Sequence, residues 1–156
     1  MASLLTERSH IVNGIVPVAD AFAGTVASDV VKVSDYHKVR FILYKGVGTT
    51  GTSTLTVVPC DDAAASTSGT AVHFNYVEIT STDVAGAMTK AATVTTSAGS
   101  NTMMIIDVDC DEIAASGYEY CYLNCVEVAN DPVLGGVLIE LYEPRYAGDG
   151  SATVLT

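Results

Sequence analysis

Short runs in which apolar and polar residues alternate constrain this chain more than any other feature. Val39, Phe41 and Leu43 alternate with Lys38 and Arg40. Because successive side chains of a strand point to opposite faces, this pattern predicts a strand with one buried and one solvated face. The same alternation sets Val72, Phe74 and Tyr76 against His73 and Asn75, and Val137, Ile139 and Leu141 against Glu140. Such strands are typical of antiparallel sheets.

Runs rich in β-branched and aromatic residues, bounded by Gly, Ser, Asp and Pro, recur along the whole chain. They predict strands at His10–Val18, Asp29–Val33, Tyr36–Lys45, Ser53–Cys60, Thr70–Ile79, Ala92–Thr96, Thr102–Cys110, Tyr118–Ala129 and Gly136–Glu143. A Gly-rich segment between Lys45 and Thr52 favours a hairpin loop. Only Asp111–Ser116 has the pattern of a short helix. With no βαβ spacing, the fold class is all-β, an antiparallel two-sheet β-sandwich of the jelly-roll type.

The chain is organised as one domain, because no linker or charge run longer than a turn divides it. We expect an N-terminal arm over residues 1–9, the β-sandwich over residues 10–146 and a C-terminal tail over residues 147–156. The arm holds an apolar pair, Leu4 and Leu5, and one of only seven basic residues, Arg8. These three are the candidate partner-binding residues, because such a segment can order on a partner. An ordinary frayed terminus is the alternative.

The charge balance excludes one class of partner. Seven Lys and Arg stand against 18 Asp and Glu, a formal net charge of −11, so a phosphate backbone would repel the domain. We therefore expect no nucleic-acid partner. No run approaches the ~18 apolar residues that a membrane span needs, and the start lacks a secretory pattern. The sequence predicts a protein made in the host cytoplasm, where its four cysteines stay thiols.

Motifs of catalysis are missing. His10, His37 and His73 belong to no recognised signature, and the sequence has neither a Gly-x-Ser-x-Gly elbow nor a His-x-x-x-His pair. We interpret the three histidines as residues of polar faces. The sequence therefore predicts a protein that is not an enzyme.

Two groups of residues invite a metal hypothesis. Cys121 and Cys125 have a spacing that zinc sites allow, but on a strand their sulfurs would stand about 13 Å apart. We expect two buried thiols instead. For the acidic residues Asp107, Asp109 and Asp111, an EF-hand would need Gly and Glu at later positions that hold Glu112 and Tyr118. We expect Asp107 and Asp109 on the solvated face of a strand end and Asp111 as the helix cap, with an irregular cation site as the alternative. No cofactor is expected.

Several segments together resemble a known family. They are Ser34–Phe41, which leads into the Gly-rich loop, then Leu55–Val57, Ile106–Asp109, Gly117–Tyr120 and Leu141–Tyr146. Over about residues 30–146 the chain resembles the head decoration, or cement, proteins of tailed bacteriophages. The resemblance implies a small, usually trimeric β-sandwich that sits on the outside of an assembled capsid, binds the major capsid protein and clamps neighbouring capsomers. It carries over no catalytic or metal-binding residue.

Composition supports self-association independently. A chain with 49% hydrophobic and 16% charged residues has more apolar surface than a monomer of this size readily hides, so we expect a symmetric oligomer, a trimer. The alternative function is a virion attachment or carbohydrate-binding module, because sandwich loops present ligand sites well. Such a module needs aromatics in its loops, whereas the expected strands contain Tyr36, Tyr44, Tyr76, Tyr122 and Tyr142.

Overall fold

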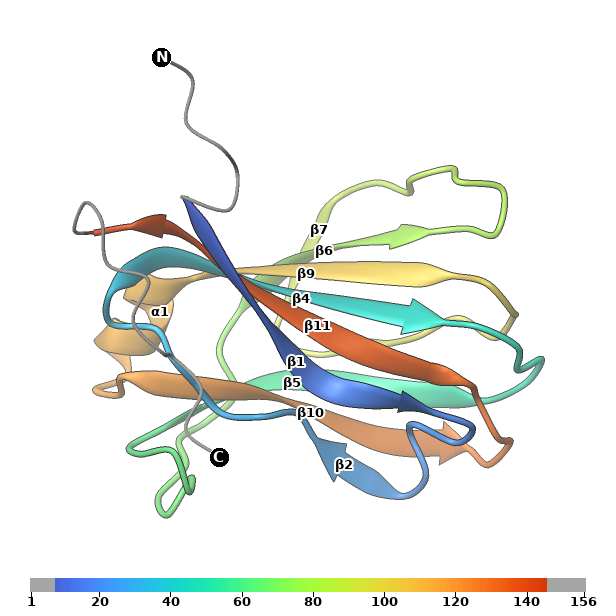
Figure 1. Cartoon of the computed structure of the whole chain (residues 1–156), viewed down its shortest axis with the longest axis horizontal. Coiled ribbons are helices and arrows are strands. Elements are labelled where there is room, and N and C mark those ends of the chain that lie inside the picture. Colours follow the sequence, from blue (N-terminus) through green and yellow to red (C-terminus); the bar gives the residue numbers. More distant parts are fainter. Residues whose placement is uncertain (1–7, 146–156) are drawn as a thin grey trace.

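Two antiparallel sheets lie face to face and enclose the core (Figure 1). The computed structural model describes residues 8–145. The six-stranded sheet has the order β1 (Ser9–Val18), β11 (Gly135–Pro144), β4 (Tyr36–Lys45), β9 (Met103–Asp109), β6 (Phe74–Ile79) and β7 (Thr89–Ala91). The five-stranded sheet contains β2 (Thr25–Ala27), β10 (Tyr120–Ala129), β5 (Thr52–Cys60) and β8 (Val94–Thr95), with β3 (Val31–Lys32) also paired to β10. The all-β sandwich is thereby confirmed.

The strand order is that of a jelly roll. If β6 and β7 are set aside, one sheet reads β1-β11-β4-β9 and the other β2-β10-β5-β8. These are the two four-stranded sheets of that architecture, with β5 and β8 adjacent and the chain otherwise crossing from sheet to sheet. The pair β6 and β7 is an insertion between β5 and β8 that widens the first sheet. The sequence prediction of a jelly roll is correct in topology as well as in class.

Most strand bounds agree with the sequence prediction, and Tyr36–Lys45 agrees at both ends. The short strands β2 and β7 were not predicted, because three residues are too few to show a period. The expected strand Asp29–Val33 shrinks to the two residues of β3, and Thr70–Ile79 begins only at Phe74. Strand β1 begins at Ser9, one residue earlier than expected.

The expected hairpin between β4 and β5 is wrong. The two strands belong to different sheets, so the Gly-rich segment crosses from one sheet to the other. Lys45 helps to hold this crossing: its side chain is buried, and its Nζ donates to the carbonyl oxygens of Gly51 at 3.1 Å and Ser97 at 2.9 Å. Burial lowers the pKa of the Lys45 ammonium group. Sequence proximity suggested pairing here, whereas closure of the sandwich required a crossing.

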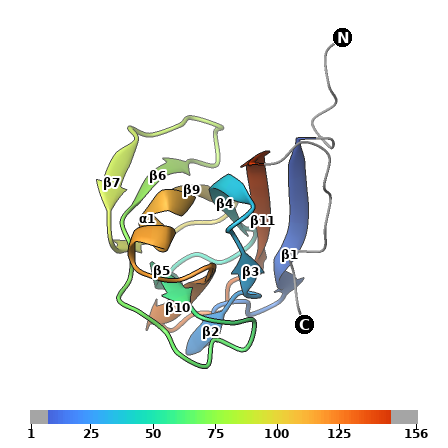
Figure 2. The ribbon, with the colours of Figure 1, turned by 90° about the vertical axis from the view of Figure 1, so that its left-hand side faces the viewer.

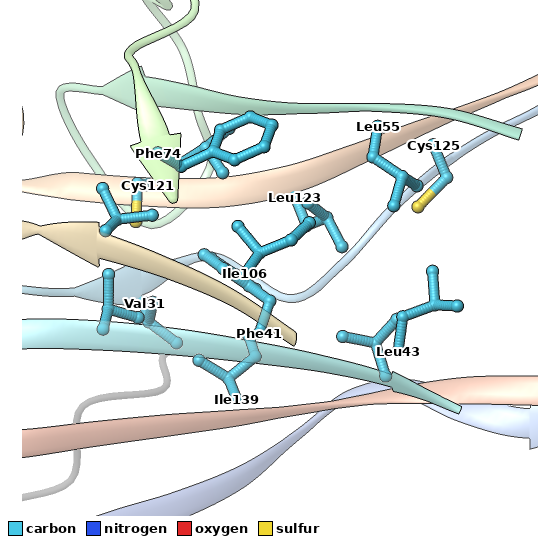
Figure 3. Close-up of a cluster of buried hydrophobic side chains, with 14 of the residues drawn as sticks. Val31, Phe41, Leu43, Leu55, Phe74, Ile106, Cys121, Leu123, Cys125 and Ile139 are labelled. Atoms are coloured by element: carbon cyan, nitrogen blue, oxygen red, sulfur yellow. The ribbon is translucent and has the colours of Figure 1, made fainter. Parts of the chain in front are cut away.

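The core lies between the sheets and consists of the alternate residues of the long strands (Figure 3). Phe41 and Ile139 from one sheet and Leu123 from the other are fully buried. The predicted alternation is confirmed on β4 and β6, and on β11 it fails at one position. Glu140 points to the outer face as expected, yet only 8% of it is exposed, because Arg40 lies across it.

A single helical turn, α1 (Cys110–Ala115), covers one end of the sandwich (Figure 2). Its Ile113 is fully buried. The N-cap is Asp109, whose side chain accepts from the Asp111 N–H, so the prediction of Asp111 as the cap is wrong by two residues. The reason is that α1 starts directly at the end of β9. No helix within residues 8–145 has the length and apolar content needed to cross a membrane.

Candidate interaction surface

The outer face of the six-stranded sheet is divided into an ionic half and an apolar half. The strand register sets its side chains in rows across the sheet. Arg40 on β4 is opposite Asp107 on β9 and Glu140 on β11. Two residues further along β4, Ile42 is opposite Ile105 and Leu138. The change from charged to apolar therefore occurs at the same row on three neighbouring strands.

We call the apolar half the apolar band. Its residues come from four strands in register: Ile42, Tyr44, Val77, Ile79, Met103, Ile105 and Leu138. Tyr44 is 55% exposed and Leu138 is 45% exposed, and the other five are partly buried. The outer face of an antiparallel sheet is ordinarily polar. A contiguous apolar patch in its place is a candidate interaction surface.

A groove of about 390 Å³ runs beside the band where β1, β11 and β4 meet. Apolar side chains line it on both sides, among them Ile15, Pro17, Leu134 and Leu138. Gly136 allows β1 to approach β11 closely at this point, because a Cβ there would lie 2.8 Å from the carbonyl oxygen of Ile15. The groove shares Ile42, Tyr44 and Leu138 with the band, so the two are continuous. The end of β4 that carries Tyr44 lies away from α1 (Figure 1).

The ionic half adjoins α1, and its charges pair with one another. Lys38 Nζ lies 2.6 Å from Asp109 Oδ2, and Arg40 Nε lies 2.7 Å from Asp107 Oδ1. Tyr142 donates from its hydroxyl to Asp107 Oδ1 at 3.1 Å, and Arg40 lies over its ring at 5.0 Å from the centroid. Each charged side chain of this ionic cluster therefore has an opposite charge within the cluster, and Arg40 is shared by Asp107 and Glu140.

The pKa shifts in the cluster follow from these contacts. The hydrogen bond from Lys38 lowers the pKa of the Asp109 carboxyl, and the same bond raises the pKa of Lys38. Burial, with the nearby Asp107 charge, raises the pKa of the Tyr142 hydroxyl to about 12. The phenol therefore stays protonated at neutral pH and acts as a donor, not as a base.

The residues proposed for a cation site each face a basic side chain. Asp107 binds Arg40, Asp109 binds Lys38, and Asp111 accepts from Arg145 at 2.6 Å. Within residues 8–145, no group of three or more His, Cys, Asp or Glu side chains is arranged to hold a metal ion. In the structure, each of these carboxylates therefore pairs with a basic side chain of the same chain.

The other candidate residues are dispersed. Cys121 and Cys125 are buried on β10 with free thiols, and burial raises the pKa of both. The histidines lie apart: His10 on β1, His37 on β4 and His73 just before β6. Arg8 is exposed immediately before β1, whereas Leu4 and Leu5 lie outside the described residues. Of the described aromatic residues, only Phe22 and Tyr118 lie outside strands, and Phe22 is buried while Tyr118 is partly buried.

Sequence reasoning missed the apolar band, although a signal for it exists. Met103, Met104, Ile105 and Ile106 are four consecutive apolar residues, so both faces of this strand are apolar before Asp107 begins the polar alternation. A strand that is apolar on both faces buries one face in the core and leaves the other on the outer face of the sheet, where it is a candidate interaction surface. Only the register shows that the same transition recurs on β4 and β11 at the same row.

Comparisons with known proteins show limited likeness. No protein-family model and no curated protein matches the chain. Among solved structures, it is similar to the SPBc2 prophage-derived protein YomS, with a TM-score of 0.48 and 11% identity over 84% of this chain and 92% of that one. It is also similar to a chain in the structure of infectious bursal disease virus Gx strain, with a TM-score of 0.42 and 14% identity, covering 94% of this chain and 38% of that one. At these scores neither likeness carries an argument about function.

Proposed function

We propose that this chain is a structural virion protein that binds the outside of an assembled phage capsid and stabilises contacts between capsomers. The observation that supports this proposal is the apolar band on a sheet face that would otherwise be solvated. Leu138 and Tyr44 expose their side chains where the band meets the apolar groove. The resemblance of residues 30–146 to phage head decoration proteins supplies the kind of partner, the major capsid protein.

The division of the outer face supports docking by one half only. The ionic cluster pairs its charges internally, so covering it would cost desolvation without new ion pairs. The apolar band has the opposite balance, because its burial removes apolar surface from water at little polar cost. An interface centred on the band with the ionic cluster at its rim has the usual arrangement of an apolar core and a polar edge.

The test is binding to capsids of the virus that encodes the chain, assembled without it. Leu138→Glu places a charge where the band meets the groove, and capsid affinity should fall at least tenfold, about 1.4 kcal/mol. The matched control is Val128→Glu on β10, since Val128 is 61% exposed on the other sheet. The control should bind normally, and both variants should keep their melting temperature. Normal binding of Leu138→Glu would refute the proposal.

A further inference from the structure

The long edge strand of the six-stranded sheet is unprotected. Strand β1 pairs with β11 on one side, and no strand within residues 8–145 pairs with its other side. It is ten residues long and contains no Asp, Glu, Lys or Arg. The other edge strands are short: β7 and β2 have three residues and β8 has two, and β7 carries Lys90. Short length, lysines, prolines and bulges protect edge strands against pairing with other chains. In β1 the only such features are Pro17 and the register shifts after Asn13, so its first half has none of them.

The part of β1 that can accept a strand is its first half. From His10 to Asn13 the register with β11 is unbroken, and shifts begin only after Asn13. At Gly14 the edge is closed, because its carbonyl oxygen accepts from the Asp29 N–H at 2.8 Å. Beside the open part lies a hollow of about 370 Å³ lined by Ile11, Val12, Asn13 and Asp29. This hollow is the space that an added strand would occupy.

We propose that the occupant is β1 of a second copy of this chain, paired antiparallel about a two-fold axis at Ile11. Ile11 is 57% exposed on the outer face, so the two copies of this side chain would meet as a cross-strand pair and bury each other. His10 would face Val12 of the second copy. The contact is isologous and needs no further partner.

Charge complementarity selects a second copy as the occupant. In this register Arg8 comes near Gly14 of the other copy, just past the end of the paired segment, and Asp29 is held beside Gly14 by its backbone hydrogen bond. Arg8 and Asp29 are both exposed, and the structure records no ion pair for the Asp29 carboxylate within residues 8–145. The two-fold axis would therefore form two Arg8–Asp29 pairs, one at each end of the new ladder. A strand from another protein would need an acidic residue near Arg8 and a basic residue near Asp29 to form the same pairs.

A two-fold contact joins two subunits and does not by itself close a trimer. In a trimeric capsid-bound protein it would join subunits of neighbouring trimers, so that the decoration layer itself becomes linked. The link between neighbouring trimers rests on the proposed function, whereas the pairing of β1 does not. The experiments below measure the pairing on the free protein, without capsids.

Disulfide trapping tests both the pairing and its register. Paired strands bring opposite Cα atoms to about 4.5–5.5 Å, within the range that a disulfide bridges. Ile11→Cys should therefore form a covalent dimer under mild oxidation. Asn13→Cys is the matched control on the same strand, because its two copies would stand about 13 Å apart. The four native cysteines are buried and do not interfere.

We expect the Ile11→Cys dimer to form at least tenfold faster than the Asn13→Cys dimer. Asp29→Arg should slow the trapping, and Arg8→Asp in the same chain should restore it, because the exchange reverses both charges of each pair. Equal rates for the two cysteine variants would overturn the proposal. If trapping succeeds while Leu138→Glu still binds capsids normally, the pairing stands and the proposed function fails. The reverse result would leave the function and reject the pairing.

Discussion

Arg40 and Asp107 face each other across strands β4 and β9, with Nε and Oδ1 2.7 Å apart. The same guanidinium reaches Glu140 at 3.5 Å on the opposite neighbouring strand, so one cation serves two carboxylates. The Glu140 side chain is only 11% exposed. The row that this arginine occupies is the last polar row before the apolar band begins, so the pair marks the boundary between the two halves of the outer face.

Arg40→Met should destabilise the fold by about 1–3 kcal/mol, because it leaves the buried Glu140 carboxylate without its cation. Adding Glu140→Gln to this variant should recover part of the loss, since it removes the uncompensated charge. Urea unfolding measures both. Lys90→Met is the control: it breaks an exposed pair with Glu112 and should change stability by less than about 1 kcal/mol. A loss for Arg40→Met no larger than for the control would contradict the argument.

Stability should depend on pH through Asp109. Its pKa is lowered in the folded protein by the hydrogen bond from Lys38, so the unfolded state binds more protons in the acidic range. The stabilisation is therefore present above the unfolded pKa of about 3.9 and is lost as pH falls through the lower folded value. Asp109→Asn keeps a capping side chain but removes the titration. The stability difference between the native protein and this variant should shrink below about pH 4, and a constant difference would rule out the Asp109 contribution.

The four thiols should be unreactive in the folded protein. Burial raises the pKa of Cys60 to about 11 and those of Cys110 and Cys125 to about 12, and it also raises that of Cys121. At pH 8 little thiolate is present, so a thiol reagent should react with all four only after denaturation. We also expect no stoichiometric zinc by elemental analysis. A chelator that lowers the melting midpoint by more than a few degrees would show that the metal prediction is wrong.

The free protein should be a trimer. Light scattering on the Ile11→Lys variant measures the trimer alone, because the added charge on the β1 edge prevents pairing of β1 with a second copy. We expect a mass of three times the 16.2 kDa of one chain at micromolar concentration. The native protein should show larger species as its concentration rises. A mass near that of one chain for both would reject self-association altogether.

The N-terminal segment should contribute to capsid binding. Deletion of residues 1–7 leaves β1 and Arg8 in place, so circular dichroism and melting should not change. Capsid affinity should nevertheless fall at least tenfold, because Leu4 and Leu5 are expected to anchor on the partner. Changing only these two leucines to Ser should reproduce most of the loss. Unchanged affinity would leave the segment as an ordinary terminus.

The sequence by itself determined the sandwich and its buried residues. Val39, Phe41 and Leu43 are fixed in the core by a period of two, which is a local property that any strand must obey. Cys121 and Cys125 were predicted to be buried for the same reason, because residues four apart on a strand lie on the same face. The jelly-roll class followed from the number of such strands and from the lack of βαβ spacing.

Only the tertiary structure decided how the faces combine. The alternation within each strand indicates that Ile42, Ile105 and Leu138 lie on an outer face. Strand order and register place them in one row, and both depend on contacts between residues far apart in the chain. The same holds for the unprotected edge at Ile11, because an edge exists only once the order of strands in a sheet is known. Periodicity acts over a few residues, whereas a surface for a partner is assembled from strands that the sequence alone leaves unordered.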